Sequence, residues 1–326
     1  MTGELDAENP QDCLVVRANM MQCPDLLGEG LERVACNLCG EGRATTLFRS
    51  GDFCVVQCVQ CGLAYVNPRL AGQQRKAVYD DAYISALTGE GNWDWTRTPE
   101  YDPVSWEATR LRYAINGHPT GRLLDVGCAS GNFLSLVKRR GWEIWGVEFN
   151  PHAAAAAAGR LNAEVLPGDL VDLHLPGEYF DVVTLFHVIE HVLDPRRTVH
   201  KIREVLKRKG RLVLETPDFG SKSARRMGAM WPHVKPREHL YYFNEQSLGK
   251  LLGEEGFQVK KVRRCGGLGA LQSGETVGSG LTLKNKAFEL RRGLAPLPWL
   301  RNLARWLYWD ISRQNEHILV VASRYW

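Results

Sequence analysis

This sequence lacks the features that mark a membrane protein or a nucleic-acid-binding protein. Its 326 residues contain no run of about 18 apolar residues, so we expect no transmembrane helix. The net charge of +4, from 41 Lys and Arg against 37 Asp and Glu, is too small to indicate binding to nucleic acid or to an anionic membrane. The N-terminal segment has early acids and no compact apolar core, unlike a signal peptide. We therefore expect a globular, cytoplasmic protein.

Cysteine, by contrast, is present in number, with nine residues in the chain. In a reducing compartment these thiols are available to a metal ion. Four of them form two Cys-x-x-Cys pairs separated by 18 residues, namely Cys36, Cys39, Cys58 and Cys61. Gly40 and Gly62 follow the two pairs at equivalent positions, where the chain must turn around the metal. Four thiolates complete a tetrahedral site, so we predict a structural zinc ribbon at 34–70, with Cys54 packed inside it.

The sequence also lacks a dinucleotide fingerprint at the one place that suggests it. Residues 123–134 read Leu-Leu-Asp-Val-Gly-Cys-Ala-Ser-Gly-Asn-Phe-Leu, a pattern typical of a strand, a glycine turn and the start of a helix. The fingerprint G-x-G-x-x-G/A needs small residues at 129 and 132, and position 132 is Asn. The pattern is instead Asp-x-Gly-x-Ala-x-Gly. A cofactor pocket and a purely structural turn both fit this stretch alone.

From residue 122 onward, short apolar strands alternate with helical segments, which predicts a doubly wound α/β fold. The expected strands are 122–126, 143–148, 163–166, 180–185, 211–215, 257–262 and 317–323. Asn150–Pro151 and Asp194–Pro195 have the N-cap and first-turn proline of a helix start. Glu148 ends the second strand, where a carboxylate can accept hydrogen bonds from both hydroxyls of a ribose. A solvated strand-end acid is the alternative for Glu148.

Five features together resemble the class I S-adenosylmethionine (SAM) methyltransferases. They are the turn 125–131, Glu148, the pair Gly168–Asp169, the segment Phe-Asp-x-Val to His-Val-Ile-Glu-His at 180–191, and Glu-His-Leu-x-Tyr-Phe at 238–243. The resemblance covers about 120–262 and the last strand, and Ala129 replaces the middle glycine of the family's first motif. It implies a Rossmann-like sheet of seven strands, mostly parallel with an antiparallel last strand, in a domain at 121–326.

The same resemblance implies which residues bind SAM. Asp125 would accept from the cofactor's ammonium group, directly or through water, and Asp169 would contact the adenine amino group. The full set implied is Asp125, Gly127, Cys128, Ala129, Gly131, Glu148, Phe149, Asp169, Leu170, Phe186 and His187.

The arrangement of ribbon, core and Glu-His loop is similar to bacterial enzymes that methylate sugar nucleotides and natural-product precursors. Sugar C-methyltransferases of that group use a loop histidine and its neighbouring acid as the base, which implies His239 with Glu238. His187 and His191 are the other candidates, and each histidine also has a purely structural interpretation. Those enzymes carry a further C-terminal domain for which this chain lacks room. We therefore expect O-methylation of a small-molecule or glycan-linked acceptor, with a histidine near neutral pKa removing the proton.

Three segments lie outside this core: a loosely ordered 1–33, an aromatic-rich helical linker or lid at 71–120, and an insertion at 264–316. The insertion has a helical apolar face at 297–310 that suits a lid, a peripheral membrane contact or a partner. Two other functions stay open, an RNA-binding or RNA-modifying protein and a non-catalytic SAM-fold scaffold. Few basic residues lie between the cysteine pairs, which argues against nucleic acid, and the intact turn and Glu148 argue against a scaffold.

Overall fold

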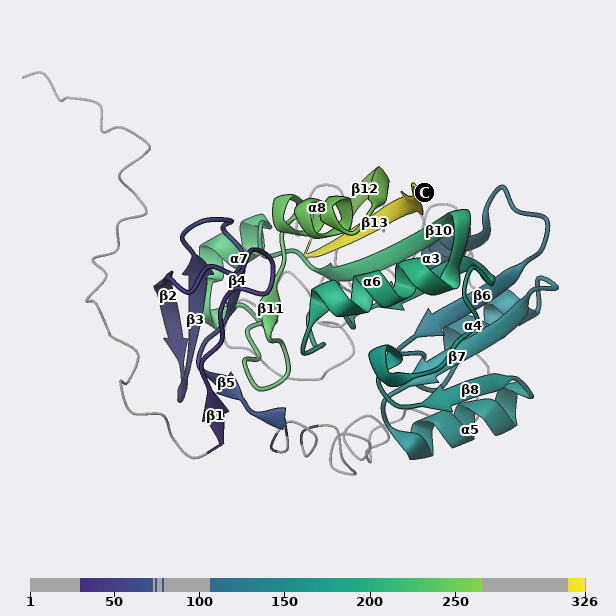
Figure 1. The fold of residues 1–326 in the computed structure, drawn as a ribbon, viewed down its shortest axis with the longest axis horizontal. Coiled ribbons are helices and arrows are strands. Elements are labelled where there is room, and N and C mark those ends of the chain that lie inside the picture. The colour runs from purple at the N-terminus through teal and green to yellow at the C-terminus, as the bar shows by residue number, and fades with distance from the viewer. Residues whose placement is uncertain (1–29, 73, 75–77, 79–105, 266–315, 326) are drawn as a thin grey trace, which may run out of the picture.

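The computed structural model describes residues 30–72, 74, 78, 106–265 and 316–325. Its largest sheet has seven strands: β6 (Arg122–Val126), β7 (Glu143–Glu148), β8 (Glu164–Pro167), β9 (Phe180–Phe186), β10 (Leu206–Pro217), β12 (Phe257–Cys265) and β13 (His317–Arg324). Their order is β12-β13-β10-β9-β6-β7-β8 (Figure 1). β13 is antiparallel to both neighbours, and the other adjacent pairs are parallel. The predicted doubly wound sheet is confirmed.

Helices cover both faces of this sheet because consecutive residues of its buried strands are apolar, so each strand presents apolar side chains to both sides. On β6, Leu123 packs with α3 (Trp106–Ile115), α4 (Asn132–Lys138) and α5 (Pro151–Leu161). Its neighbour Leu124 belongs to the opposite core, with α6 (Pro195–Val205), α8 (Glu245–Glu254) and the short helix η3 (Leu170–Asp172). The two cores therefore flank a sheet that is buried on both sides.

The predicted helix starts are confirmed by their caps. Asn150 Oδ1 accepts hydrogen bonds from His152 and Ala153 N–H, and Asp194 accepts one from Arg197 N–H. Such a cap stabilises a helix by about 1 kcal/mol. The fifth strand is longer than the predicted 211–215, because β10 pairs on one side with β9 and on the other with β13.

The ribbon forms a second sheet that includes a strand from the larger domain. Its members are β2 (Ala44–Ser50), β3 (Phe53–Cys58), β4 (Ala64–Val66) and β11 (Tyr241–Tyr242), in the order β11-β4-β3-β2. A separate two-stranded sheet pairs β1 (Leu31–Glu32) with β5 (Arg69–Leu70). β11 lies between α7 (Lys222–Met227), the short helix η4 (Gly228–Met230) and α8 along the chain. It pairs antiparallel with β4 and covers an edge that would otherwise be unpaired. Figure 1 shows the ribbon beside β11 and α7.

Candidate functional site

The glycine turn after β6 has a backbone that glycine adopts most easily. Gly127 and Gly131 have φ angles of 72° and 76°, in the left-handed region that side chains disfavour. A Cβ atom at Gly127 would lie 2.3 Å from Val188 Cγ2, and one at Gly131 would lie 2.5 Å from Leu161 Cδ1. The two glycines therefore permit a tight turn at the carboxyl edge of the sheet, where ligands of open α/β sheets bind.

Asp125 precedes this turn and is buried, with 3% of its surface exposed. Its carboxylate accepts a hydrogen bond of 2.6 Å from Thr184 Oγ1. Burial raises the pKa of Asp125 to about 7, although Thr184 and Arg110 act in the opposite direction. A cation nearby would lower this pKa, because it favours the ionised carboxylate. The contact with a cofactor ammonium group stays a prediction, and the raised pKa gives it a measurable signature.

Glu148 connects the end of β7 to the glycine turn. Its Oε2 accepts from Ala129 N–H at 2.9 Å, and its Oε1 accepts from Asn150 N–H at 3.1 Å. Burial raises the pKa of Glu148, while the amides of Asn150 and Ala129 lower it. The Phe149 amide lowers it as well. A carboxylate has about four lone-pair sites, so some capacity to accept from a hydroxyl group remains. Phe149, which follows, exposes 42% of its surface at this edge.

Other residues predicted to bind the cofactor differ in what they can offer. Cys128 and Leu170 are buried, so their side chains pack in the two cores and their backbone atoms are what a ligand could reach. Asp169 begins η3, and its Oδ1 accepts from Val171 N–H at 3.2 Å. Residues of the predicted set thus lie at or just after the ends of three neighbouring strands, β8, β7 and β6.

Phe186 ends the next strand, β9. Its ring packs edge-on against Phe133, with 5.0 Å between centroids. The guanidinium of Arg110 lies over the same ring at 4.7 Å, and Arg110 Nε donates to Glu215 Oε2 at 2.7 Å. Arg110, from α3, was not anticipated from the sequence, and it contributes a partly buried positive charge to this edge.

His187 lies directly after Phe186, between two carboxylates. Its Nε2 is 3.0 Å from Glu215 Oε1, and its Nδ1 is 3.4 Å from Glu190 Oε1. Burial lowers the pKa of His187, but the two carboxylates outweigh burial and raise it to about 9. With φ of 56°, His187 is held in a strained backbone conformation, of the kind found at functional sites. Its side chain is 32% exposed, so a ligand can reach it.

His191 and His239 come from distant segments and meet with ring centroids 4.6 Å apart. His191 Nδ1 donates to the Glu238 carbonyl at 3.1 Å, and His239 Nδ1 donates to the His233 carbonyl at 2.8 Å. Burial lowers the pKa of His191, and it lowers that of His239 to about 3. The structure thus brings the predicted histidines together, with His239 only 7% exposed. The assignment of His239 and Glu238 as the base stays a prediction.

Two further histidines extend this group and were not anticipated. His317, at the start of β13, has its ring 4.7 Å from that of His187 and 5.0 Å from that of His233. His317 Nδ1 also lies 3.5 Å from Glu215 Oε1. A signal was present in the sequence: Glu215 lies near the end of one strand and His317 begins an antiparallel one, so both occur at the same edge of the sheet.

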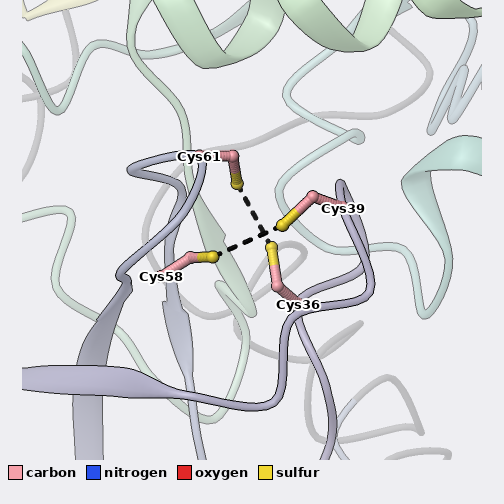
Figure 2. A group of neighbouring side chains, drawn as sticks. All are labelled: Cys36, Cys39, Cys58 and Cys61. Atoms are coloured by element: carbon pink, nitrogen blue, oxygen red, sulfur yellow. Dashed lines mark hydrogen bonds between the residues drawn. The ribbon is translucent and has the colours of Figure 1, made fainter.

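The four ribbon cysteines form a compact group in which every pair of sulfur atoms lies within 4.8 Å (Figure 2). Cys36 Sγ and Cys61 Sγ are 3.4 Å apart, and Cys39 Sγ and Cys58 Sγ are 3.5 Å apart. Four sulfurs around zinc would be about 3.8 Å apart, since Zn–S bonds are about 2.3 Å. Burial raises the pKa of Cys36, and the turn amides lower it. The residues present therefore fit tetrahedral zinc.

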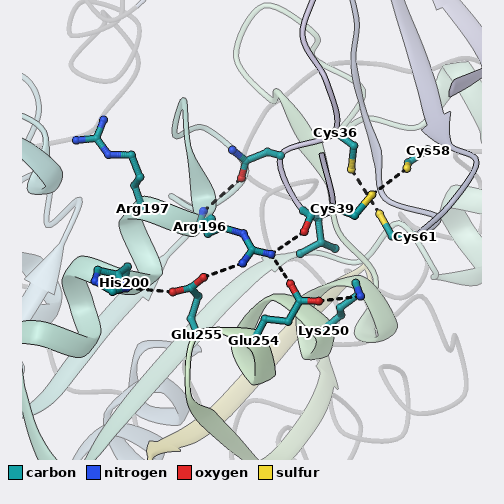
Figure 3. Close-up of polar contacts among 12 residues, drawn as sticks. Cys36, Cys39, Cys58, Cys61, Arg196, Arg197, His200, Lys250, Glu254 and Glu255 are labelled. Carbon is teal, nitrogen blue, oxygen red and sulfur yellow. Dashed lines mark hydrogen bonds and ion pairs between the residues drawn. The ribbon is translucent and has the colours of Figure 1, made fainter. Parts of the chain in front are cut away.

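Arg196 connects the first cysteine pair to the larger domain (Figure 3). Its backbone N–H donates to Asn37 Oδ1 at 3.3 Å, and its Nη2 donates to the Leu38 carbonyl at 2.6 Å. The same guanidinium forms ion pairs with Glu254, the last residue of α8, and with Glu255, which follows it. The ribbon is therefore attached through charged groups as well as through β11.

Several predictions fall outside the described residues. The loosely ordered segment 1–33 is described only from residue 30, and most of the linker 71–120 and the insertion 264–316, with its face at 297–310, is not covered. Within the parts of the chain that the structure describes, no helix is long and apolar enough to cross a membrane.

Comparison with known proteins agrees with this geometry. Residues 100–262 match the model of a methyltransferase domain. A Mycobacterium tuberculosis (strain H37Rv) protein described as a probable S-adenosylmethionine-dependent methyltransferase is 31% identical over 145 residues, 44% of this chain and 50% of that protein. A ubiquinone biosynthesis O-methyltransferase of Alkalilimnicola ehrlichii is 29% identical over 163 residues, 46% of this chain and 64% of that protein. The chain thus spans about half to two thirds of these relatives.

The fold also has a counterpart among solved structures. The [4+2]-cyclase SpnF superposes with a TM-score of 0.51 and 17% sequence identity, covering 79% of this chain and 98% of that chain. At this identity the likeness concerns the fold alone.

Proposed function

Because this chain belongs to the class I SAM-dependent methyltransferase family, we propose that it transfers a methyl group from SAM to a hydroxyl oxygen of a small-molecule or glycan-linked acceptor. The observation that carries the proposal is the junction of Glu148 with the glycine turn. The Glu148 carboxylate lies beside the turn at the edge of the sheet where open α/β sheets bind their ligands. The names of several relatives, which are ubiquinone O-methyltransferases, favour oxygen as the acceptor atom.

The residues present fit SAM. Glu148 would accept the ribose hydroxyls, the exposed ring of Phe149 would lie against the adenine, and Asp125 would respond to the ammonium group. SAM supplies an electrophilic methyl group when bound. The protein must then align the acceptor oxygen with that methyl group at about 3 Å and exclude water.

We assign His187 as the residue that contacts the acceptor, on grounds of geometry. It follows Phe186 at the end of β9, and its side chain is more exposed than those of Glu190 and Glu215, with which it interacts. The two carboxylates hold the imidazole in place, so its exposed part would meet an acceptor in a fixed orientation. His239 is less accessible, since its residue is 7% exposed.

The test is methyl transfer from methyl-labelled SAM to a panel of sugar nucleotides, quinols and RNA, with SAM binding measured in parallel by calorimetry. We expect SAM to bind and the label to appear on a hydroxyl oxygen of a sugar or quinol. Label found only in RNA would replace the proposal with RNA modification. Absence of SAM binding would replace it with a non-catalytic scaffold.

A further inference from the structure

A second group of metal-ligating side chains lies beside His187, built from two segments far apart in the sequence. Glu190 and His191 follow β9, and His239 precedes β11. One ligand atom from each of the three lies within 4.8 Å of the other two. We propose that Glu190, His191 and His239 bind a divalent transition-metal ion.

The ring nitrogens of both histidines are oriented for this role. In each ring Nδ1 faces a backbone carbonyl, that of Glu238 for His191 and that of His233 for His239. A carbonyl only accepts, so Nδ1 must carry the hydrogen and Nε2 presents a lone pair. A carbonyl that fixes the second ring nitrogen is also what usually orients a metal-binding histidine.

Glu190 supplies the negative charge. The residue is 1% exposed, and its Oε2 accepts from Thr216 Oγ1 at 2.9 Å. Its buried Oε1 lies 3.4 Å from His187 Nδ1, without a well-aligned hydrogen bond, and 4.0 Å from His191 Nε2. A buried carboxylate oxygen without a hydrogen bond is costly, and a cation at this position would satisfy it.

The donor set selects a class of ion. Two imidazole nitrogens and one carboxylate oxygen suit zinc, iron(II), cobalt(II) and related ions, whereas magnesium and calcium prefer oxygen ligands alone. Three protein ligands leave further coordination positions open. The site thus differs from the ribbon, where four thiolates complete the coordination.

A competing group consists of His187, Glu215 and His317, whose ligand atoms also lie within 4.8 Å of one another. It is less suited to a metal. His187 Nε2 lies 3.0 Å from Glu215 Oε1, so this nitrogen donates a hydrogen to the carboxylate rather than offering a lone pair to a metal. Glu215 already accepts from Arg110 and His187. This group is the natural alternative for an experiment to separate.

The role of the ion rests on the proposed function, whereas its binding does not. A metal-bound acceptor hydroxyl loses its proton to solvent more readily, because the cation stabilises the alkoxide. The alkoxide oxygen would then form a bond to the methyl carbon as the carbon–sulfur bond breaks. The bonding pair would pass to sulfur and give S-adenosylhomocysteine. This chemistry needs no strongly basic histidine.

The experiment uses the full chain carrying zinc in its ribbon, titrated with Co²⁺ and followed by visible absorption. We expect one Co²⁺ per chain, with the weak bands of nitrogen and oxygen ligands and no sulfur-to-cobalt charge transfer. His191→Asn and His239→Asn should each weaken Co²⁺ binding by about 100-fold or more. The asparagine amide can still donate to the carbonyl that the histidine contacted. His233→Asn and His317→Asn are matched controls that should bind Co²⁺ normally.

Calorimetric SAM binding shows whether each variant is folded. If a variant does not fold, the test is made instead by proton NMR of the wild-type chain with bound Co²⁺. Two Nδ1–H signals with strongly shifted resonances would identify the two histidine ligands directly. Loss of binding in His317→Asn but not in His239→Asn would assign the ion to the competing group and overturn the proposal. So would the absence of any cobalt beyond the ribbon site. If Co²⁺ binds but no acceptor is methylated, the proposed function fails and the metal site stands.

Discussion

The four ribbon cysteines form one cluster, and Glu190, His191 and His239 form another beside the cofactor edge, the carboxyl edge of the sheet where Asp125 and Glu148 lie. The two clusters differ in how the chain builds them. Each Cys-x-x-Cys pair supplies two ligands from one turn, so the spacing alone identifies the four cysteines. Glu190 and His191 are also adjacent in sequence, but His239 reaches them only through the tertiary fold. Local spacing therefore predicts the first cluster, whereas the second appears only when two distant segments are placed side by side.

The two clusters are nevertheless connected through a few backbone bonds. Leu240 N–H donates to the Glu190 carbonyl at 2.8 Å, and the Leu240 carbonyl accepts from Val66 N–H at 2.9 Å. Val66 ends β4, the ribbon strand that pairs with β11. The ribbon thus holds the segment in which His239 lies. The predicted zinc site and the proposed metal site are thus joined by backbone hydrogen bonds.

The largest effect should follow removal of the ribbon metal. A strong zinc chelator, or Cys36→Ser with Cys39→Ser, should unfold the ribbon, because a structural zinc contributes on the order of 10 kcal/mol to so small a unit. Thermal denaturation and limited proteolysis at 34–70 would measure this. Cobalt binding at the second cluster should be lost with it, and one equivalent of zinc, enough for the ribbon alone, should restore both once the chelator has been removed. If the protein still binds cobalt at the second cluster after its ribbon has been cleaved, the two clusters are independent.

The cofactor edge provides the next test, because it should respond separately from both clusters. Glu148→Gln should weaken SAM binding about 10- to 100-fold, since hydrogen bonds to a charged group are worth about 1.5–3 kcal/mol each. Calorimetry measures the change. Glu143→Gln is the matched control, because Glu143 begins the same strand and its side chain is 49% exposed. An equal loss in both variants would contradict a specific role for Glu148.

How far the sequence anticipates each region follows from the range of the interactions involved. The strand order agrees with a fold expected from alternating apolar strands and from caps such as Asn150 and Asp194, which act within a few residues. The cysteine group is likewise local. The position of His317 opposite Pro217 depends on the register of β13 against β10, which no short pattern specifies. Arg110 meets Glu215 only when α3 packs on the sheet.

The segment at β11 shows most clearly what a sequence pattern cannot predict. The sequence pattern at 238–243 predicts a functional loop, but it does not predict that Tyr241 and Tyr242 join the ribbon sheet. That pairing requires an exposed edge on β4 and a core shared by Tyr65 and Leu240. Both are properties of two domains packed together.

A smaller effect is expected from proton linkage at Asp125, at the cofactor edge. Its pKa is raised from 3.8 to about 7, so at about pH 6 the unliganded carboxyl is mostly protonated. The ammonium group of SAM would lower this pKa, and binding should release up to about one proton per chain. Calorimetry at that pH in buffers of different ionisation enthalpy measures the release. Asp125→Asn should abolish it, and a release unchanged in that variant would assign the proton to another group.

The raised pKa of Asp125 also makes the stability of the folded protein depend on pH. A buried acid with a raised pKa favours the folded state while it is protonated, so its contribution declines as pH rises from about 4 to about 7. The melting temperature of the SAM-free protein should fall over this range more steeply than that of Asp125→Asn. Saturating SAM should reduce the difference between the two proteins.

The smallest effect is expected where the ribbon meets α6 and α8. Arg196→Met removes the hydrogen bond to the Leu38 carbonyl and the ion pairs with Glu254 and Glu255. The Arg196 side chain is 39% exposed, so we expect a loss of only about 1 kcal/mol. Zinc release to a chelator should be faster, because the first cysteine pair is less firmly held.

Arg197→Met is the matched control, since Arg197 is exposed and its side chain points away from the cysteines in Figure 3. If both variants release zinc at the wild-type rate, the ribbon is held to the larger domain by β11 and the shared core alone. If only Arg196→Met is faster, the charged contacts contribute as well. The affinity of that variant for cobalt would then show whether loosening the ribbon also weakens the position of His239.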